Sequence, residues 1–390
     1  MGSPSPVLSK NLPLLENWFT GPGTPGRETN GRSVLVVYIT PHGLGHAART
    51  CDVLWAFRTL YPEVPVTVVS RLPNWFLTSR KLEVKERVAA FDVGIVQRDA
   101  VEMDIPATLV KLRDLMADWD ALVRSEAEWL NSQKARLVVS DIPAIPLQAA
   151  ALAGVPSVAV TSFSWDWIYS AFRHQDPFWQ EVIEKFRNGY KSCPLLLRYP
   201  FSGPMKSFER VEDIRLVARP GEDRRRELAA LTGADPRKPW LLFCLSHLEF
   251  QSPNCLAEFS DYQFLTAGDL NWEAPNCFSL DPKAHRFADL VASCQAVVTK
   301  PGFGILSDCA VNNKPIIYVE REGFLEYPIL VDGIKRHLRG WHTPLQSLYR
   351  GKLGPALEAF SAGLPAAPEP LQTPGPDEVA HRLYQLMIRG

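Results

Sequence analysis

Two histidines and two glycines in one short segment are the first residues of this sequence whose types suggest chemistry. Thr40–Arg49 reads Thr-Pro-His-Gly-Leu-Gly-His-Ala-Ala-Arg, which places His42, Gly43, Gly45 and His46 close together. An imidazole titrates near neutral pH, so His46 could remove a proton from a hydroxyl group. Glycines let a ligand approach the backbone, and free N–H groups at a helix start favour anionic groups. Alternatively, the two histidines only cap the helix or satisfy local hydrogen bonds.

An aspartate at the end of an apolar run is the second candidate. Leu137–Asp141 reads Leu-Val-Val-Ser-Asp, and Asp141 follows His46 by 95 positions. A buried carboxylate is unfavourable unless it is paired. Beside an imidazole it would orient the ring and stabilise the charged form of the ring. The alternative interpretation is that Asp141 caps a helix that begins near Pro143.

A glycine loop with a lysine and an aspartate is the third candidate. Val298–Asp308 reads Val-Thr-Lys-Pro-Gly-Phe-Gly-Ile-Leu-Ser-Asp. We expect a strand to end before Lys300 and a helix to begin near Ile305. In that geometry backbone N–H groups, the helix dipole and the lysine could hold phosphates, and Asp308 could accept hydrogen bonds from ribose hydroxyls. The alternative is a strand–turn–helix in which the glycines serve packing. The candidate donor-binding residues of this segment are Lys300, Gly302, Gly304, Ile305 and Asp308.

Two further segments carry acidic and aromatic residues. Glu326 lies in Arg321–Pro328 and could contact sugar hydroxyls, although a glutamate in a loop can equally be only solvated. Val160–Tyr169 contains Ser-Trp-Asp-Trp-Ile-Tyr, including Trp165 and Asp166. A plainer interpretation of this second segment is aromatic packing in the core.

These segments must be positioned by alternating strands and helices. The continuous apolar run Ser33–Thr40 is typical of a buried parallel strand, and a helical pattern follows it to about Leu60. Ala107–Ser132 has apolar residues near a 3.6-residue period and predicts a long helix, and a shorter helix is expected over Pro143–Ala153. Further strands are expected at 64–70, 137–140, 157–161, 240–246, 277–280, 296–299 and 315–320. Such alternation predicts parallel sheets covered by helices, which bind ligands at the carboxyl ends of their strands.

The length of the chain predicts two domains. Its 390 residues exceed what one hydrophobic core usually organises. Residues 1–31 are rich in Pro, Gly, Ser and Asn, and we interpret them as an irregular leader. We expect an N-terminal domain over 32–215 and a C-terminal domain over 216–390, whose last helix could cross back to the first domain. The charged run Glu222–Glu227 is interpreted as a solvated helix face beside the linker.

Composition argues against several classes of protein. Lys and Arg total 42 and Asp and Glu total 43, so the net charge of −1 does not demand a nucleic-acid partner and none is expected, although a local basic patch stays possible. Seven scattered cysteines without a C-x-x-C pair argue against a disulfide framework and a zinc site, and no metal site is expected. The N-terminus lacks the pattern of a secretory signal, and the apolar stretch Ala144–Val160 is broken by prolines and a glycine, so no membrane span is expected. A cytoplasmic location is the simplest expectation, and nothing indicates the oligomeric state.

Taken together, these segments resemble the glycosyltransferase-like N-terminal half of plant L-arabinokinases. The resemblance runs from about Ser33 to the C-terminus, and Ser164–Tyr169 is its most specific part. L-arabinokinases continue into a sugar-kinase domain with a glycine- and serine-rich ATP loop. This sequence shows no such segment, so the resemblance does not imply kinase activity.

More distantly, the chain resembles inverting nucleotide-sugar glycosyltransferases of the plant secondary-metabolite and MurG types. The resemblance implies that His46 is the base, that Asp141 orients it, and that Lys300 stands where a histidine contacts the pyrophosphate. It departs from the pattern at Leu245–Glu249, where glycines are usual, and it lacks an evident base-stacking aromatic residue. The Asp-Gln pair that holds the sugar is also missing, with Glu326–Tyr327 in its place.

The resemblance implies an α/β protein of the GT-B fold, with two Rossmann-like domains that face a central cleft. The expected reaction is an inverting, metal-independent transfer from a nucleoside-diphosphate sugar, with a UDP-sugar as the first candidate, to an unidentified hydroxyl acceptor. No cofactor is expected beyond that substrate. The acceptor side is expected to include His42, Gly43, Gly45, Trp165 and Asp166. The alternatives are a catalytically silent nucleotide-sugar sensor or scaffold, and a GT-B epimerase or phosphorylase.

Overall fold

The computed structural model describes residues 33–97, 103–245, 250–268 and 270–389. The expected leader, 1–31, lies outside the described residues. So do four of the five residues in the segment 245–249, where the sequence departs from the related pattern.

The N-terminal half is built on a parallel sheet of seven strands in the order β3-β2-β1-β4-β5-β6-β7. Leu35, Val37 and Ile39 of the central strand β1 enter one apolar cluster, whereas Val36 and Tyr38 enter another. The strand is continuously apolar because both faces of the sheet are covered. The strands are β1 (Val34–Ile39), β2 (Val66–Ser70), β3 (Lys85–Val88), β4 (Ala135–Asp141), β5 (Ser157–Thr161), β6 (Leu196–Arg198) and β7 (Val211–Asp213).

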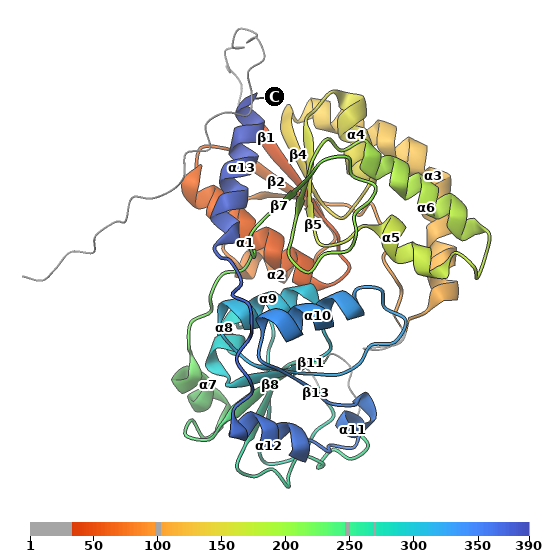
Figure 1. The fold of residues 1–390 in the computed structure, drawn as a ribbon. Coiled ribbons are helices and arrows are strands. Elements are labelled where there is room, and N and C mark those ends of the chain that lie inside the picture. Colours follow the sequence, from red (N-terminus) through yellow and green to blue (C-terminus); the bar gives the residue numbers. More distant parts are fainter. Residues whose placement is uncertain (1–32, 98–102, 246–249, 269, 390) are drawn as a thin grey trace, which may run out of the picture. The chain divides into compact units, whose positions relative to one another are not determined.

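Helices cover both faces of this sheet (Figure 1). α3, α4 and α6 pack together on the face that buries Trp119 and Trp179, and α1 packs on the other face. The helices of this half are α1 (Leu44–Leu60), α2 (Asn74–Ser79), α3 (Ile105–Ser132), α4 (Ile145–Ala153), α5 (Trp165–Tyr169) and α6 (Phe178–Lys191), with a 3-10 turn at Ser170–Phe172.

The C-terminal half repeats the plan with a parallel sheet of six strands in the order β10-β9-β8-β11-β12-β13. Its strands are β8 (Trp240–Cys244), β9 (Gln263–Ala267), β10 (Cys277–Leu280), β11 (Ala296–Thr299), β12 (Ile316–Tyr318) and β13 (Gly340–His342). Its helices are α7 (Arg225–Thr232), α8 (Phe287–Ser293), α9 (Phe303–Val311), α10 (Tyr327–His337), α11 (Leu345–Tyr349) and α12 (Gly354–Ala362).

The last helix, α13 (Gly375–Arg389), packs against α1 and β4 of the N-terminal half (Figure 1). Its Tyr384 ring stacks on Tyr61 with centroids 3.8 Å apart, and the Tyr61 hydroxyl lies 2.6 Å from His381 Nδ1. Leu383 is buried in the same cluster as β1. The last helix therefore crosses back to the N-terminal half, which the sequence had suggested as a possibility.

The expected α/β class, with two parallel sheets covered by helices, is confirmed. Across the part of the chain that the structure describes, no helix has the length and apolar character needed to span a bilayer.

Candidate active site

The first candidate residues meet at the carboxyl edge of the N-terminal sheet. β1 and β4 are neighbours, and Ile39 lies opposite Asp141 in their register. The chain turns after β1 and enters α1, which places His46 in the first turn of that helix. His46 Nδ1 lies 3.1 Å from Asp141 Oδ1, and the Thr50 hydroxyl donates a 2.7 Å hydrogen bond to Asp141 Oδ2. The fully buried carboxylate is thus paired on both oxygens and fixes the ring of His46.

The capping alternative for Asp141 does not hold. α4 begins at Ile145 with Ala144 as its N-cap, and no side chain caps it. The residue between, Ile142, has φ of +87°, which a β-branched residue rarely adopts. The hydroxyl of Tyr190 donates a 2.9 Å hydrogen bond to its carbonyl group. This strained turn lies directly beside the candidate pair.

The charge state of His46 depends on carboxylates from both halves of the chain. Burial lowers the pKa of His46, but the charge and hydrogen bond of Asp141, followed by the charges of Glu326 and Asp92, outweigh burial and raise it above the usual value. Glu326 precedes α10 in the C-terminal half and is buried. Burial raises the pKa of Glu326 to about 7, against the lowering influence of His46 and Arg321. Glu326, which the sequence predicts as a sugar contact, therefore interacts electrostatically with His46, the predicted base.

A second imidazole–carboxylate pair lies in the same region, and sequence reasoning missed its acid. His42 Nε2 lies 3.5 Å from Asp92 Oδ1 and 3.2 Å from the Asp92 carbonyl oxygen. The indole N–H of Trp165 donates a 2.8 Å hydrogen bond to Asp92 Oδ2. Burial raises the pKa of Asp92, against the lowering influence of His42 and Trp165. Asp92 follows the charged strand β3 in an irregular segment, so no motif or period marks it.

The starts of α1 and α9 touch each other through glycines. A Cβ built on Gly304 would lie 2.9 Å from the Gly45 Cα, so this approach requires glycine at 304. The N-cap of α1 is Gly43 with φ of +94°, and the N-cap of α9 is Gly302; neither helix has a side-chain cap. Unpaired backbone N–H groups and the positive ends of two helix dipoles therefore converge here. Such a place favours an anion.

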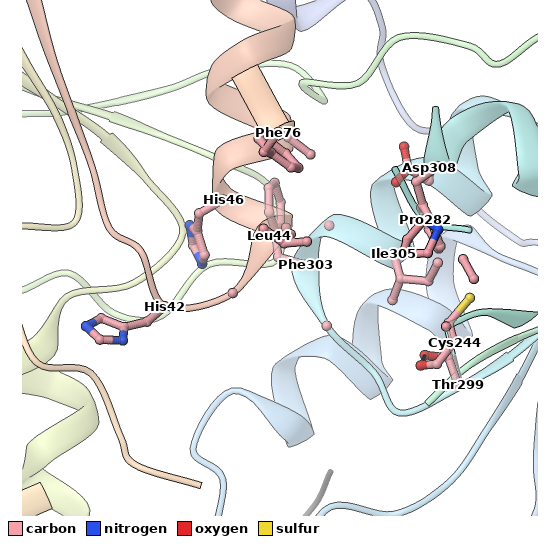
Figure 2. Close-up of a pocket in the computed structure, with 18 of the residues that line it drawn as sticks. His42, Leu44, His46, Phe76, Cys244, Pro282, Thr299, Phe303, Ile305 and Asp308 are labelled. Atoms are coloured by element: carbon pink, nitrogen blue, oxygen red, sulfur yellow. Dashed lines mark hydrogen bonds between the residues drawn. The ribbon is translucent and has the colours of Figure 1, made fainter. Parts of the chain in front are cut away.

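A cavity of about 1520 Å³ lies along these helix starts and is lined by both halves of the chain. Figure 2 shows His42 and His46 on the side of α1, and Ile305 and Asp308 on α9. Within the described residues, the lysines and arginines on the cavity wall number eight and the carboxylates three. The sequence-predicted residues on the wall are His42, Gly43, Gly45, His46, Trp165, Lys300, Gly302, Gly304, Ile305, Asp308 and Glu326. Its volume exceeds that of typical small-molecule sites, and its charge suits an anionic ligand.

One predicted acceptor residue is placed elsewhere. Trp165 and Ile168 of α5 face the cavity, whereas Asp166, on another side of the short helix, does not line it. The Asp166 carboxylate accepts a hydrogen bond from the hydroxyl of Ser207 and lies 4.0 Å from Arg187 Nε. In this structure Asp166 therefore makes buried structural contacts outside the cavity, and its contact with an acceptor stays a prediction.

Asp308 lines the cavity but already has a partner. Its Oδ1 accepts a 2.8 Å hydrogen bond from Arg49 Nη2, and both side chains are almost fully buried. Arg49 also lies 3.5 Å from Asp52 and donates to the carbonyl group of Val217 at 3.3 Å. The carboxylate expected to bind a ribose thus joins α9 to α1 in this structure.

Among the residues that the structure describes, no cluster of three or more His, Cys, Asp or Glu side chains could hold a metal ion.

No family model matches the chain. Over 336 residues it is 30% identical to L-arabinokinase of Arabidopsis thaliana, a match that covers 83% of this chain and 32% of that protein. Among solved structures, Phytolacca americana UGT2, complexed with UDP-2-fluoroglucose and pterostilbene, is similar with a TM-score of 0.58 at 12% identity, covering 91% of this chain and 94% of that one. The calicheamicin glycosyltransferase CalG4 is similar with a TM-score of 0.55 at 14% identity, covering 92% of this chain and 94% of that one.

These comparisons confirm the expected fold and the expected resemblance. The fold is the GT-B fold of glycosyltransferases. The chain spans about a third of the length of the L-arabinokinase that it matches.

Proposed function

We propose that this chain, which has the GT-B fold and resembles one third of an L-arabinokinase, transfers a sugar from a nucleoside-diphosphate donor to a hydroxyl group of an acceptor. The observation that carries the proposal is the buried His46–Asp141 pair, whose His46 lines the cavity. The start of α9 and Lys300 lie on the wall that the C-terminal half contributes. One wall offers a base and the other offers groups that stabilise a diphosphate.

The proposed reaction is a single displacement with inversion at the anomeric carbon. His46 Nε2, the nitrogen not engaged by Asp141, takes the proton of the acceptor hydroxyl as its oxygen bonds to that carbon. The bond from the carbon to the diphosphate oxygen breaks through an oxocarbenium-like state. The departing diphosphate keeps the bonding electrons, and the backbone N–H groups of Gly302–Ile305 and Lys300 stabilise its charge. In this proposal Glu326, which lines the same cavity, accepts hydrogen bonds from donor sugar hydroxyls.

A UDP-sugar is the first donor to test. The similar structure of UGT2 contains UDP-2-fluoroglucose, and the similar structure of VinC, with a TM-score of 0.50, contains dTDP. The excess of cations on the described cavity wall supports a diphosphate ligand in this chain as well. The name L-arabinokinase describes a whole protein of which this chain matches 32%, so the kinase activity is not carried over.

We further propose that no metal ion takes part, because the helix starts and Lys300 supply the positive charge that a metal would supply. Turnover should then persist in excess EDTA. Loss of turnover on chelation, with recovery on addition of magnesium or manganese, would contradict this proposal. Lys300→Ala should weaken nucleoside-diphosphate binding by about 1.5–3 kcal/mol, the range for a hydrogen bond to a charged group.

The experiment that tests the main proposal measures release of UDP from UDP-sugars with a panel of hydroxyl acceptors. His46→Ala should lower the turnover rate by about 10²-fold or more, the usual contribution of a general base. UDP affinity, measured by calorimetry, should barely change because the donor contacts belong to the other wall. His174→Ala is the control, since His174 is exposed in the same half of the chain. If His42→Ala abolishes turnover and His46→Ala does not, the base is assigned wrongly.

The second candidate function is a nucleotide-sugar sensor without turnover. The ion pair between Asp308 and Arg49 favours it, because the carboxylate expected to hold the ribose is already engaged. The sensor would bind UDP or UDP-sugars, as calorimetry would show, without any release of UDP. Release of UDP that His46→Ala suppresses would exclude it.

A further inference from the structure

The proposed reaction uses one base, His46, but the second imidazole–carboxylate pair, His42 and Asp92, is also held in place by surrounding residues. Asp92 is 6% exposed, and Trp165 fixes its Oδ2. Its Oδ1 has no hydrogen-bond partner of its own and lies 3.5 Å from the ring of His42. A Cβ on Gly94 would lie 2.5 Å from the His42 ring. The segment after β3 can therefore pack against that ring only because residue 94 is glycine. The fold therefore holds the imidazole of His42 in one orientation.

The contacts of His42 leave one ring nitrogen for a ligand. Nε2 faces both the carbonyl oxygen and the carboxylate of Asp92, so in the neutral ring the proton belongs on Nε2. Nδ1 then carries the lone pair and can accept a hydrogen bond from a hydroxyl group. The side chain is 32% exposed and lines the cavity. His42 thus presents the same chemistry as His46, with the roles of the two nitrogens exchanged.

The two imidazoles share one aromatic wall. The rings of His46 and Phe163 pack edge to face with centroids 5.2 Å apart. The centroid distances are 5.0 Å from Phe163 to Trp165 and 6.2 Å from Trp165 to His42. Both histidines come from the turn before α1 or its first residues (Figure 2). Two acceptors of hydroxyl protons, His42 and His46, therefore lie around one part of the cavity.

A ligand with one hydroxyl group could engage only one of these acceptors. The other would lose its hydration without replacement, which costs about 1–3 kcal/mol for a polar group that the ligand covers. Sites built to bind a hydroxyl group discriminate strongly against ligands that lack it. We infer that the acceptor is a polyhydroxylated molecule of the monosaccharide class, with one hydroxyl at His46 and a neighbouring hydroxyl held by His42. This inference rests on the proposed function and adds the class of its acceptor.

The test uses free pentoses and hexoses as probes, with monohydroxylated phenols and alcohols of similar size for comparison. Binding is measured by calorimetry with UDP present, and transfer is measured as acceptor-dependent release of UDP from a UDP-sugar. Wild-type protein should bind at least one monosaccharide saturably and none of the monohydroxylated probes. His42→Gln should weaken monosaccharide binding about tenfold, which corresponds to about one hydrogen bond.

A deoxy analogue separates a direct contact from a structural role. Removing the neighbouring hydroxyl from the best monosaccharide should weaken its binding to wild-type protein but not to His42→Gln. Asp92→Asn should show part of the same effect through loss of ring orientation. His174→Gln is the matched control in the same half of the chain. Equal losses with the deoxy analogue in wild type and variant, saturable transfer to phenols, or no monosaccharide binding would each overturn the inference. Absence of UDP release would instead count against the proposed function, because the binding measurements do not depend on turnover.

Discussion

At the residue scale, the proposed base must lose a proton before it can act, and its carboxylate partner opposes that loss. The charge and the hydrogen bond of Asp141 help to raise the pKa of His46 above its usual value, against the lowering effect of burial. The kcat/KM of transfer should therefore rise with pH along a limb that lies above about pH 6.5, the unperturbed value for histidine. Asp141→Asn keeps the size of the side chain and removes its charge. The limb should move to lower pH while the plateau falls, which a pH profile of kcat/KM would show. An unchanged limb would contradict the assignment of His46 as the base.

Glu326 is a second residue whose titration should be measurable. Burial raises the pKa of its carboxyl group from 4.5 to about 7, so the folded state holds a proton that the unfolded state has already released. Below pH 4.5 both states are protonated, and the wild type should lose stability as the pH rises from 4.5 to about 7. Glu326→Gln removes this loss and should be more stable than wild type at pH 8 by up to about 3 kcal/mol.

The measurement is urea unfolding at several values between pH 4.5 and pH 8. Glu322→Gln provides the control, because Glu322 is exposed in the same loop. A pH dependence for Glu326→Gln no larger than that of the control would show that folding does not shift the pKa of Glu326.

The residues of the site differ in how far the sequence could predict them. Asp141 ends the buried strand β4, and His46 lies in the first turn of the helix that follows the buried strand β1. The pattern of strands alone therefore predicted both residues at one edge of the sheet. Asp92 follows an edge strand whose residues are mostly charged, so nothing marked it. The engagement of Asp308 could not be foreseen, because its partner Arg49 lies 259 positions away on another helix.

At the element scale, the same contrast separates buried strands from edge strands. β1 and β5 are buried along nearly their whole length, and their apolar runs predicted them to within a residue or two. β3 and β7 lie at the two edges of the N-terminal sheet and read Lys-Glu-Arg-Val and Val-Glu-Asp. Such short, charged segments pair only because the sheet is already present beside them, which local sequence does not show.

The contact between α1 and α9 gives a prediction about elements. A Cβ on Gly304 would lie 2.9 Å from the Gly45 Cα, whereas a Cβ on Gly45 would have its nearest contact at 3.6 Å. Gly304→Ala should push the helices apart and destabilise the protein by about 1–3 kcal/mol, the usual range for overpacking. Gly45→Ala should be tolerated within about 0.5 kcal/mol. Urea unfolding of both variants checks this, and equal effects would show that the close approach is not maintained in solution.

At the scale of the whole molecule, the two halves of the chain share one apolar cluster. That cluster includes Leu35 of β1, Leu242 of β8, Leu306 of α9 and Leu383 of α13. The sequence indicated two halves from its length and from the charged stretch between them. The continuity of the core could not be read from the sequence, since it depends on which helix faces meet. Because α13 packs on α1, the C-terminal segment also stabilises the helix that carries His46.

The ion pair between Arg49 and Asp308 joins a helix of one half to a helix of the other, and its strength can be measured. Both side chains are buried, so removing one partner leaves an unpaired buried charge, which typically costs 3–5 kcal/mol. Arg49→Met and Asp308→Asn should each lower the free energy of unfolding by about that amount. The double variant should lose much less than the sum, because it leaves neither charge of this pair without its partner. Urea unfolding of the three variants completes the cycle.

The exposed pair of Arg198 and Asp213 supplies the matched cycle within one half. The distance from Arg198 Nε to Asp213 Oδ1 is 2.6 Å, similar to the 2.8 Å between Arg49 and Asp308, but the Asp213 side chain is 70% exposed. Solvent screening should limit the coupling of this pair to about 1 kcal/mol or less. If the coupling between Arg49 and Asp308 is no larger, the pair does not hold α9 against α1, and Asp308 is free to exchange Arg49 for a ribose. In that case Asp308→Asn should weaken UDP binding without loss of stability, which calorimetry on the same variant would show.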